Sequence, residues 1–225
     1  TLVLNGADVD DNEACNLAAA ITHNHSISTL ELSHNLLGKI ESSAAVNPHI
    51  MTGAMALGLM LEINTTLTKL DVSWNAIKHR SAEKFATSLM KTKTLRELHL
   101  GHNGIGDEAA QLIGRVLKSN TSLTTIDLSY NSLHPKSIGV LANALMFNGY
   151  MSLMKLDGNI LGRIGITAMV AAIQRSSDKM TKLNLTFNEC DCRYRYSVVW
   201  YCIIKYQSFD FYILHMFYLF ITALL

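Results

Sequence analysis

One apolar pattern, repeated along most of the chain, constrains the fold more than any other feature. The pattern L-x-x-L-x-L-x-x-N-x-L, with other apolar residues allowed at the leucine positions, fits residues 95–105 and recurs on both sides of them. Its asparagine position falls at residues 7, 35, 75, 103, 131, 159 and 188, with alanine in the first copy. The steps between copies are 28 or 29 residues, apart from one of 40. We therefore expect seven copies of one structural unit.

Each copy continues with apolar residues at helical spacing. After Asn103, the residues Ala110, Ile113 and Leu117 follow in steps of three and four. Alternating apolar residues followed by this spacing predict a short strand and then an amphipathic helix. The 40-residue step fits the pattern if about 12 residues are inserted near 38–53. This insert contains Pro48 and small polar residues, which predict a loop.

Over residues 1–189 the chain resembles the leucine-rich repeat proteins, on the pattern and period described above. A 28-residue period with a full helix resembles the ribonuclease-inhibitor-like subclass, which includes the C-terminal arrays of NOD-like receptors and the Ran GTPase-activating proteins. The resemblance implies an α/β solenoid of about seven repeats, a curved horseshoe with parallel strands on the concave face and helices on the convex face. Each repeated asparagine is expected to satisfy backbone groups in the turn after its strand.

Function in such an array must come from positions that the pattern leaves free. The residue between the second and third leucine positions of each strand points into the concave face. We call five of these positions the concave strip: Glu31, Asp71, His99, Asp127 and Lys155. With strands about 4.8 Å apart, His99 should lie between two aspartates. The strip is either a cross-strand charge ladder or a recognition surface for a protein partner.

A second free position, directly before the asparagine, carries rings in four consecutive copies. We call these residues the ring row: His34, Trp74, His102 and Tyr130. Glycine occupies the same position at Gly6 and Gly158. Aromatic residues are enriched at the energetic centres of interfaces, which makes Trp74 and Tyr130 the leading contact candidates. The alternative is that the rings pack on one another and on the turn.

The glycines of the run LRELHLGHNGIGDEAA suggest a nucleotide-binding loop, because they lie between an expected strand and an expected helix. Sister segments in the same register lack these glycines, and no P-loop lysine follows. The order G-x-x-G-x-G also reverses the dinucleotide fingerprint. We therefore expect no cofactor and interpret the glycines as turn residues.

Catalytic and metal sites are not expected either. His34 and His102 are separated by the copy that contains Trp74, so one zinc ion is difficult to build between them. A triad of Ser73, His99 and Asp127 can be drawn, but strand positions give no reason for an oxyanion hole. Serines two residues before three of the asparagines are likewise interpreted as turn residues: Ser33, Ser73 and Ser129. The chain is therefore predicted not to be an enzyme.

The alternative function is activation of a small GTPase, as in the Ran GTPase-activating proteins. It requires an arginine near a strand-to-helix turn that can stabilise charge during phosphoryl transfer. Arg80 and Arg163 lie in such turns, but no surrounding motif matches either to a family catalytic arginine. Our main interpretation is a protein–protein interaction module or scaffold, possessing no enzymatic activity, within a larger sensor or regulatory protein.

Composition favours a protein partner. The formal net charge of +1 gives no reason to expect nucleic acid or an anionic membrane surface. The spacing of the four cysteines is not that of a disulfide scaffold, which favours a reducing, cytoplasmic location. Glycosylation motifs begin at Asn24, Asn64, Asn120 and Asn184, three of them in helix-closing turns where asparagine is favoured anyway. The chain is expected to be monomeric, and its first residue, Thr1, suggests a fragment.

The pattern fails after Glu189, and residues 190–225 form a hydrophobic, aromatic tail. Three interpretations remain for it: a membrane anchor over residues 198–225, a cap on the end of the array, or a gene-model artefact. The last 15 residues fall short of the roughly 20 needed to span a bilayer. The abrupt change of composition favours the artefact.

Overall fold

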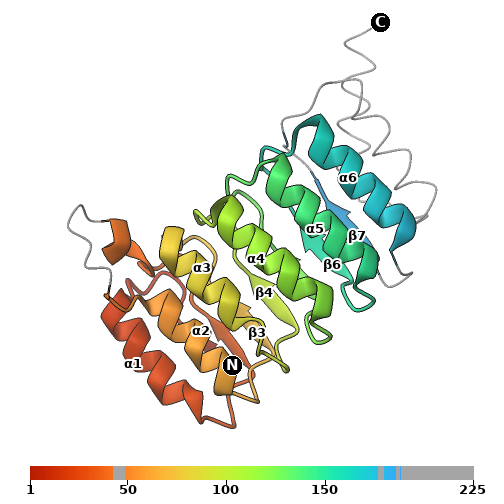
Figure 1. Ribbon diagram of the computed structural model, residues 1–225. Helices are drawn as coiled ribbons and strands as arrows, with labels where there is room; N and C mark the ends of the chain where they lie inside the picture. Colours follow the sequence, from red (N-terminus) through yellow and green to blue (C-terminus); the bar gives the residue numbers. More distant parts are fainter. Residues whose placement is uncertain (43–48, 177–179, 186–187, 189–225) are drawn as a thin grey trace, which may run out of the picture.

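The computed structural model describes residues 1–42, 49–176, 180–185 and 188. Within them, strands and helices alternate along the chain, apart from one 3-10 helix in the insert (Figure 1). The strands are β1 (Leu2–Val3), β2 (Thr29–Glu31), β3 (Lys69–Asp71), β4 (Glu97–His99), β5 (Thr125–Asp127), β6 (Leu153–Lys155) and β7 (Lys182–Asn184). The helices are α1 (Asp11–Thr22), α2 (Gly53–Ile63), α3 (His79–Ser88), α4 (Gly106–Ser119), α5 (Pro135–Phe147) and α6 (Gly162–Arg175).

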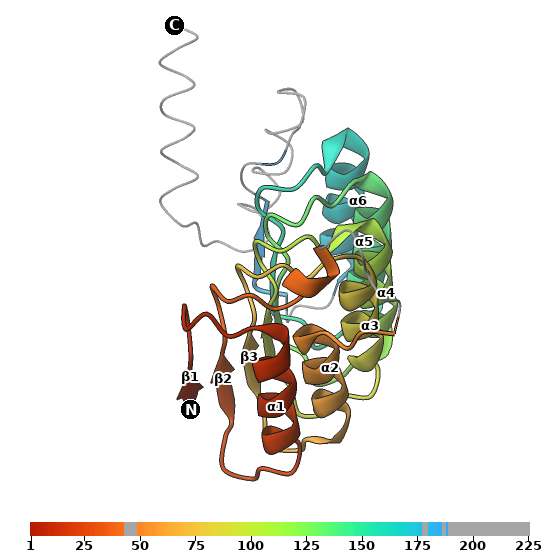
Figure 2. The same cartoon turned by 90° about the vertical axis from the view of Figure 1, so that its left-hand side faces the viewer.

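The seven strands form one parallel sheet in sequence order, and the helices form a second layer beside it. Figure 2 shows the helices on one side of the sheet, while the described residues leave its other side uncovered. The strands pair in register, so that Leu70 lies beside Leu30 and Leu98. This is the predicted leucine-rich repeat solenoid.

The repeated apolar residues form the core between the two layers. The central residues of β2 to β6 have no exposed surface: Leu30, Leu70, Leu98, Ile126 and Met154. The helix positions identified from the sequence are buried as well, including Ala110, Ile113 and Leu117. Each large apolar side chain buried in this way contributes about 1.5–3 kcal/mol relative to an exposed one. The stack of repeats therefore provides the core that a single repeat lacks.

The repeated asparagines form a hydrogen-bonded ladder along the edge where the strands end, as predicted. Asn131, for example, has no exposed surface, and its Nδ2 donates to the carbonyl oxygens of Leu100 and Ser129. Its Oδ1 accepts from the backbone N–H of Ile105, in the preceding repeat. Asn35, Asn75, Asn103 and Asn159 make equivalent bonds.

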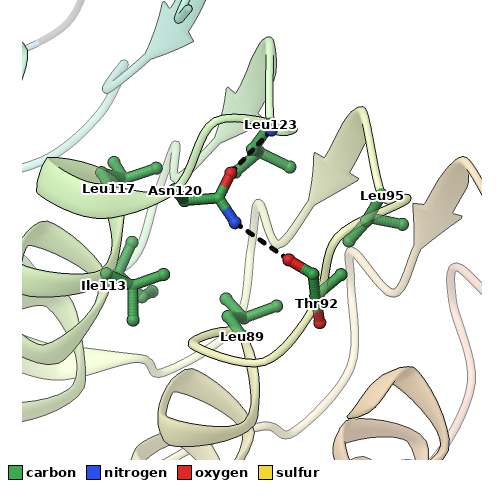
Figure 3. A pocket seen from close by; sticks show the side chains of 8 residues that line it. Leu89, Thr92, Leu95, Ile113, Leu117, Asn120 and Leu123 are labelled. Atoms are coloured by element: carbon green, nitrogen blue, oxygen red, sulfur yellow. Dashed lines mark hydrogen bonds between the residues drawn. The ribbon is translucent and has the colours of Figure 1, made fainter. Parts of the chain in front are cut away.

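A second ladder, which the sequence analysis did not predict, runs along the opposite edge, where each helix turns into the next strand. Figure 3 shows one of its members, Asn120, whose Nδ2 donates to the Thr92 carbonyl oxygen and whose Oδ1 accepts from the Leu123 N–H. Asn64 and Asn148 make the same kinds of bond. The apolar cavity beside Asn120 has a volume of about 10 Å³, at most the size of one water molecule, and is therefore a packing gap.

The insert differs in part from the loop predicted for residues 38–53. Lys39–Ser42 form a turn of 3-10 helix, η1, and α2 already begins at Gly53. The cause is the buried carboxylate of Asp11, which accepts hydrogen bonds from the N–H groups of Gly38, Ile40 and Gly53. These bonds join both ends of the insert to the start of α1. Residues 43–48, and with them Pro48, lie outside the described residues.

The domain boundary predicted at residue 189 and the tail 190–225 also lie outside the described residues. Up to Asn188 the repeat continues, since its Oδ1 accepts from the Asn159 N–H just as the Oδ1 of Asn159 accepts from the Asn131 N–H. Within the described part of the chain, no helix combines the length and the apolar character needed to cross a membrane.

Candidate functional site: the uncovered sheet face and its rim

The concave strip lies in one line across the uncovered face of the sheet. The register pairs Glu31 with Asp71, Asp71 with His99, His99 with Asp127, and Asp127 with Lys155. His99 therefore lies between two aspartates, as predicted from the strand spacing.

Charges of the strip pair across strands. Lys155 Nζ lies 3.1 Å from Asp127 Oδ2, and His99 Nδ1 lies 4.0 Å from the same oxygen. On β2, the Glu31 carboxylate lies 2.9 Å from Nζ of Lys69 on β3. The prediction of a cross-strand charge ladder is thus confirmed for Asp127 with His99 and with Lys155, whereas the pair of Glu31 and Lys69 was not predicted. Because the side chains remain partly exposed, each pair contributes at most about 1 kcal/mol to stability.

Two charged residues of this face were missed by the sequence analysis. Lys69 and Glu97 lie two positions before Asp71 and His99 on the same strands, and Glu97 Oε2 is 3.9 Å from His99 Nε2. Residues two apart on a strand face the same side, so strand alternation alone contained this signal. On β3 and β4 the uncovered face therefore presents two charged or ionisable side chains from each strand.

Asp127 is the electrostatic centre of the strip. Burial alone raises the pKa of its carboxyl group. The interaction with His99, the hydrogen bond from the Ser129 N–H and the charge of Lys155 outweigh burial, and the pKa lies well below its usual range. Asp127 is therefore ionised at neutral pH, which keeps the ion pair with Lys155 in place.

The ring row forms one continuous stack along the rim beside the asparagine ladder. The ring centroids of His34 and Trp74 are 5.0 Å apart, those of Trp74 and His102 3.6 Å, and those of His102 and Tyr130 4.2 Å. Successive ring planes are inclined by only 10° to 14°. The interpretation that these rings pack on one another is therefore confirmed.

Packing leaves much of the row exposed. Trp74 retains 49% of its surface and Tyr130 retains 41%, both among the exposed large hydrophobic residues. Stacking covers the ring faces of the central members, so the exposed parts are mainly the ring edges. Recognition of a partner by these edges remains a prediction.

All four ring residues have left-handed backbone conformations. Their φ angles are 57° at His34, 54° at Trp74, 55° at His102 and 54° at Tyr130. Gly6 and Gly158, at the same position in other copies, have φ of 61° and 65°. Residues with a Cβ are disfavoured in this region by roughly 1–2 kcal/mol, a cost that glycine does not have. The turn thus requires a conformation that suits glycine, and four copies carry rings instead.

The interior of the stack changes the protonation of His102. Its ring lies between those of Trp74 and Tyr130, and this burial lowers its pKa. The carboxylate of Asp127 raises the pKa in part, and His34 lowers it further. His102 is therefore neutral at pH 7 and acts as a flat, uncharged member of the stack.

The geometry does not assemble the catalytic or metal sites considered from the sequence. The Ser73 hydroxyl donates to Asp71 Oδ1 at 2.6 Å, so its hydrogen bond is to Asp71 and not to His99. The Trp74 ring lies between those of His34 and His102. Among the described residues, no group of three or more histidine, cysteine or acidic side chains is arranged to hold a metal ion.

The glycines of the run around Asn103 allow the backbone conformation and the close packing of the turn. Gly106 has φ of 69°, and a Cβ at Gly101 would lie 3.2 Å from Asp127 Oδ1. Gly104 forms a bridge with Lys78, so its backbone lies against the preceding repeat. These are conformational and packing roles, consistent with the interpretation as turn residues.

Arg80 and Arg163 lie in the first turns of α3 and α6, at the strand-to-helix edge. Arg80 Nη2 is 3.4 Å from the Ile50 carbonyl oxygen, a contact with the end of the insert. At the opposite edge, the Nδ2 atoms of Asn64 and Asn120, to which a glycan would be attached, donate to backbone carbonyls of the second ladder. Glycosylation there would break these hydrogen bonds.

Comparisons with known proteins agree with the fold. The family model described as "Leucine Rich repeat" matches residues 64–86, 92–114 and 119–142. The tropomodulin C-terminal domain of Caenorhabditis elegans is similar in structure, with 16% identity and a TM-score of 0.55, over 68% of this chain and 92% of that one. A structure described as the actin-binding site 2 of leiomodin-1 has 17% identity and a TM-score of 0.50, over 58% of this chain and 75% of that one. No curated protein sequence matches the chain.

Proposed function

Because this chain is a leucine-rich repeat protein, we propose that it is a protein-interaction module, not an enzyme, which binds another protein through the concave strip and the ring row. The residues proposed to contact the partner are Glu31, Asp71, His99, Asp127, Lys155, His34, Trp74, His102 and Tyr130.

The observation that carries the proposal is the conformation of the ring row. Gly6 and Gly158 occupy the same left-handed position, so the fold does not require a ring there. Stacking offsets part of the conformational cost, at about 0.5–1.5 kcal/mol for each aromatic pair. Rings that are strained, half-exposed and unnecessary for the turn are what a recognition surface would retain.

The neighbouring concave strip supports the same function. Its charges point away from the core and lie within the same repeats as the ring row. A strip of alternating charge gives electrostatic selectivity and a faster association rate with a partner of complementary charge. Aromatic anchors beside a polar surface are typical of protein interfaces.

A capture experiment tests this function. The full chain is immobilised, and proteins retained by the wild type are compared with those retained by Trp74→Ala and by Ile164→Ala. Ile164, on α6, is 72% exposed and lies on the helix layer, so it is the matched control. We expect a partner retained by the wild type and by Ile164→Ala and lost with Trp74→Ala. Equal retention by all three proteins would contradict the proposed site.

Purified actin is a reasonable first partner to test. One of the structurally similar proteins is described as an actin-binding site, although the likeness extends to the fold alone. Cosedimentation of the wild type with actin filaments, lost with Trp74→Ala, would identify the partner. Absence of binding would exclude actin and leave the proposed surface to other proteins.

GTPase activation of the Ran GTPase-activating type has no supporting observation. The Arg80 guanidinium contacts the backbone of the insert, and neither similar structure is described as a GTPase-activating protein. We expect GTP hydrolysis by small GTPases to proceed at the same rate with and without the chain. The remaining proposals are a monomer in the cytoplasm and a role as the recognition part of a larger sensor, as in NOD-like receptors.

A further inference from the structure

The edge with the second ladder, where each helix turns into the next strand, carries exposed apolar side chains. Met90 follows α3 and is 66% exposed, Phe147 ends α5 and is 62% exposed, and Tyr150 lies in the next turn and is 45% exposed. The helices α3, α4 and α5 pack side by side in the middle of the array, with described repeats on both sides of them (Figure 1). The exposure of these side chains therefore does not depend on where the chain begins or ends.

Sister repeats show that the fold does not require rings at these positions. The residue directly before a second-ladder asparagine is Ile63, Ser119 or Phe147. The residue two positions after the asparagine is Thr66, Ser122 or Tyr150, and in each case its backbone N–H donates to the asparagine Oδ1. Because serine and threonine occupy the same turn with the same hydrogen bonds, neither the ladder nor the turn explains an exposed ring.

The same turns are basic. Residues 60–68, 88–96, 116–124, 144–152 and 172–176 contain five basic residues and one acidic residue, although the whole chain has a formal net charge of only +1. The acidic residue, Glu62, pairs with Lys91, whose Nζ lies 2.6 Å from Glu62 Oε2. The other basic residues of these turns are Lys93, Arg96, Lys118 and Arg175. This edge therefore attracts negative charge.

Lys118 connects the positive charge with the exposed rings. Its Nζ lies 4.8 Å from the centroid of the Phe147 ring in the next repeat, a cation–π contact. Arg115 is exposed three residues before Lys118, on the same side of α4. A binding partner thus meets positive charge and apolar surface side by side. We call this surface the basic edge: Met90, Lys93, Arg115, Lys118, Phe147 and Tyr150.

The dimensions of the basic edge suit a short peptide segment. It extends over two helix spacings of about 8–10 Å each, a length that five or six residues of extended peptide cover at about 3.3 Å per residue. Duplex DNA carries about ten phosphate charges over the same length, more than the few cations of this surface can neutralise. The exposed Ser119 and Thr121 interrupt the apolar side chains, so no continuous apolar face is available to enter a bilayer.

We propose that the basic edge is a second interaction surface, which binds an extended acidic segment of a partner protein. Carboxylates of the segment pair with Lys93 and Lys118, and an apolar side chain between them packs on Phe147. Because these pairs are exposed to water, binding weakens as the salt concentration rises. The basic edge shares no residue with the concave strip or the ring row and lies at the opposite edge of the sheet from the ring row, so the inference goes beyond the proposed function.

The first test uses a peptide probe and nuclear magnetic resonance at low salt. An acetylated hexapeptide of four glutamates, one phenylalanine and one leucine is titrated against the full chain. Its counterparts carry glutamine in place of glutamate, or serine in place of the two apolar residues. We expect saturable shifts of the Phe147 ring and the Lys118 amide with the acidic hexapeptide, and at least several-fold weaker binding of both counterparts. Equal binding of either counterpart, or no saturable shifts at these residues up to millimolar concentration, would overturn the inference.

Substitutions provide the second test. Lys118→Glu reverses the charge beside Phe147, and Lys136→Glu makes the same change in the exposed first turn of α5, at the opposite edge. Phe147→Ser introduces the residue that the preceding repeat carries at this position, so the fold should tolerate it. We expect Lys118→Glu and Phe147→Ser each to weaken hexapeptide binding by at least about fivefold, and Lys136→Glu to leave it unchanged, all with unchanged circular dichroism. Unchanged binding by either variant of the basic edge, once shown to be folded, would overturn the inference.

Two other anionic probes distinguish the class of partner. Vesicles of phosphatidylcholine and phosphatidylserine, and single-stranded oligothymidylate, are compared with the hexapeptide at the same salt concentration. We expect both to bind more weakly than the hexapeptide. Tighter binding of either probe, lost with Lys118→Glu, would assign the basic edge to that class of partner and overturn the inference. The outcome is separable from the proposed function, because Trp74→Ala should abolish partner capture and leave hexapeptide binding unchanged.

Discussion

The asparagine ladder and the ring row are adjacent in the sequence and differ in nearly every physical respect. Asn131 has no exposed surface and bonds to backbone groups of two repeats, whereas Tyr130 is 41% exposed and contacts another ring. The ladder uses the same residue from Asn35 to Asn188, while the ring position holds histidine, tryptophan, tyrosine, phenylalanine or glycine. The fold determines the residue at the ladder position. The ring position, directly before it, accepts glycine or a side chain that tolerates a positive φ.

Within one turn, therefore, the ladder residue is explained by folding, and the ring residue is not. Replacing a ladder asparagine leaves backbone groups without partners in every case, so the fold fixes the residue. Glycine would satisfy the ring position at a lower conformational cost, as Gly6 and Gly158 show. The rings are therefore the residues in this turn that require an explanation outside folding.

The largest expected effect is on the ladder. Asn131→Ala removes two donated hydrogen bonds and one accepted bond inside the fold. We expect the free energy of unfolding to fall by roughly 2–4 kcal/mol, since buried groups left unpaired cost about 1–3 kcal/mol each. Urea denaturation measures it, with the exposed Asn12→Ala in α1 as control. A loss no larger than that of the control would refute the structural role of the ladder.

The two glycines of the ring position provide the next comparison. Gly158→Ala introduces a Cβ into the space of the Tyr130 ring, whereas Gly6→Ala meets open space. Both substitutions carry the left-handed cost of roughly 1–2 kcal/mol, and the first also displaces the ring. We expect Gly158→Ala to be the less stable variant in thermal unfolding and to change the ring signals of Tyr130. Equal stability and unchanged Tyr130 signals would show that the stack does not end on Gly158.

Two substitutions of Trp74 separate the cost of its left-handed backbone conformation from the contribution of its ring to stability. Trp74→Gly and Trp74→Ala both remove the ring, but only alanine retains the cost of a Cβ at φ of 54°. We expect the glycine variant to be more stable than the alanine variant by roughly 1–2 kcal/mol in urea denaturation. The reverse order would mean that the residue relaxes out of the left-handed region when the ring is removed.

The smallest expected effect is on the titration of His102. Its pKa is lowered by burial in the stack, so the unfolded chain binds this proton more readily. Stability should therefore decline as the pH falls below about 6.5 and should be restored above it. A nuclear magnetic resonance titration should place the pKa of His102 below that value, and Trp74→Gly should raise it by exposing the ring to water. A pKa unaffected by Trp74→Gly would exclude the stack as the cause.

Much of the fold could be predicted from the spacing of the apolar residues and asparagines. The order of strands, the position of His99 and the ladder all follow from a pattern in which each copy repeats its neighbour. The conformation of the ring row was not predicted, because the pattern specifies which residues are buried and not their backbone angles. The glycines at positions 6 and 158 were nevertheless a signal, since glycine at a position that otherwise carries rings suggests a positive φ.

The insert shows why the remainder could not be predicted. Asp11 holds Gly38, Ile40 and Gly53, contacts across 27 to 42 residues that no local pattern contains. Lys69 and Glu97, in contrast to the contacts of Asp11, could have been identified from the sequence, because strand alternation alone places them on the uncovered face. Recognition by the concave strip and the ring row concerns a second molecule, which the sequence of this chain does not specify.

The most direct test of the central claim compares Trp74→Gly with the wild type in two measurements on the same protein: the free energy of unfolding and the affinity for the captured partner. The account predicts a change in unfolding free energy of about 1 kcal/mol or less, since relief of strain offsets lost stacking. It predicts a loss of affinity of at least about 30-fold, the effect of a residue at the centre of an interface. Unchanged affinity in the stable variant would contradict the claim that the ring row is retained for recognition.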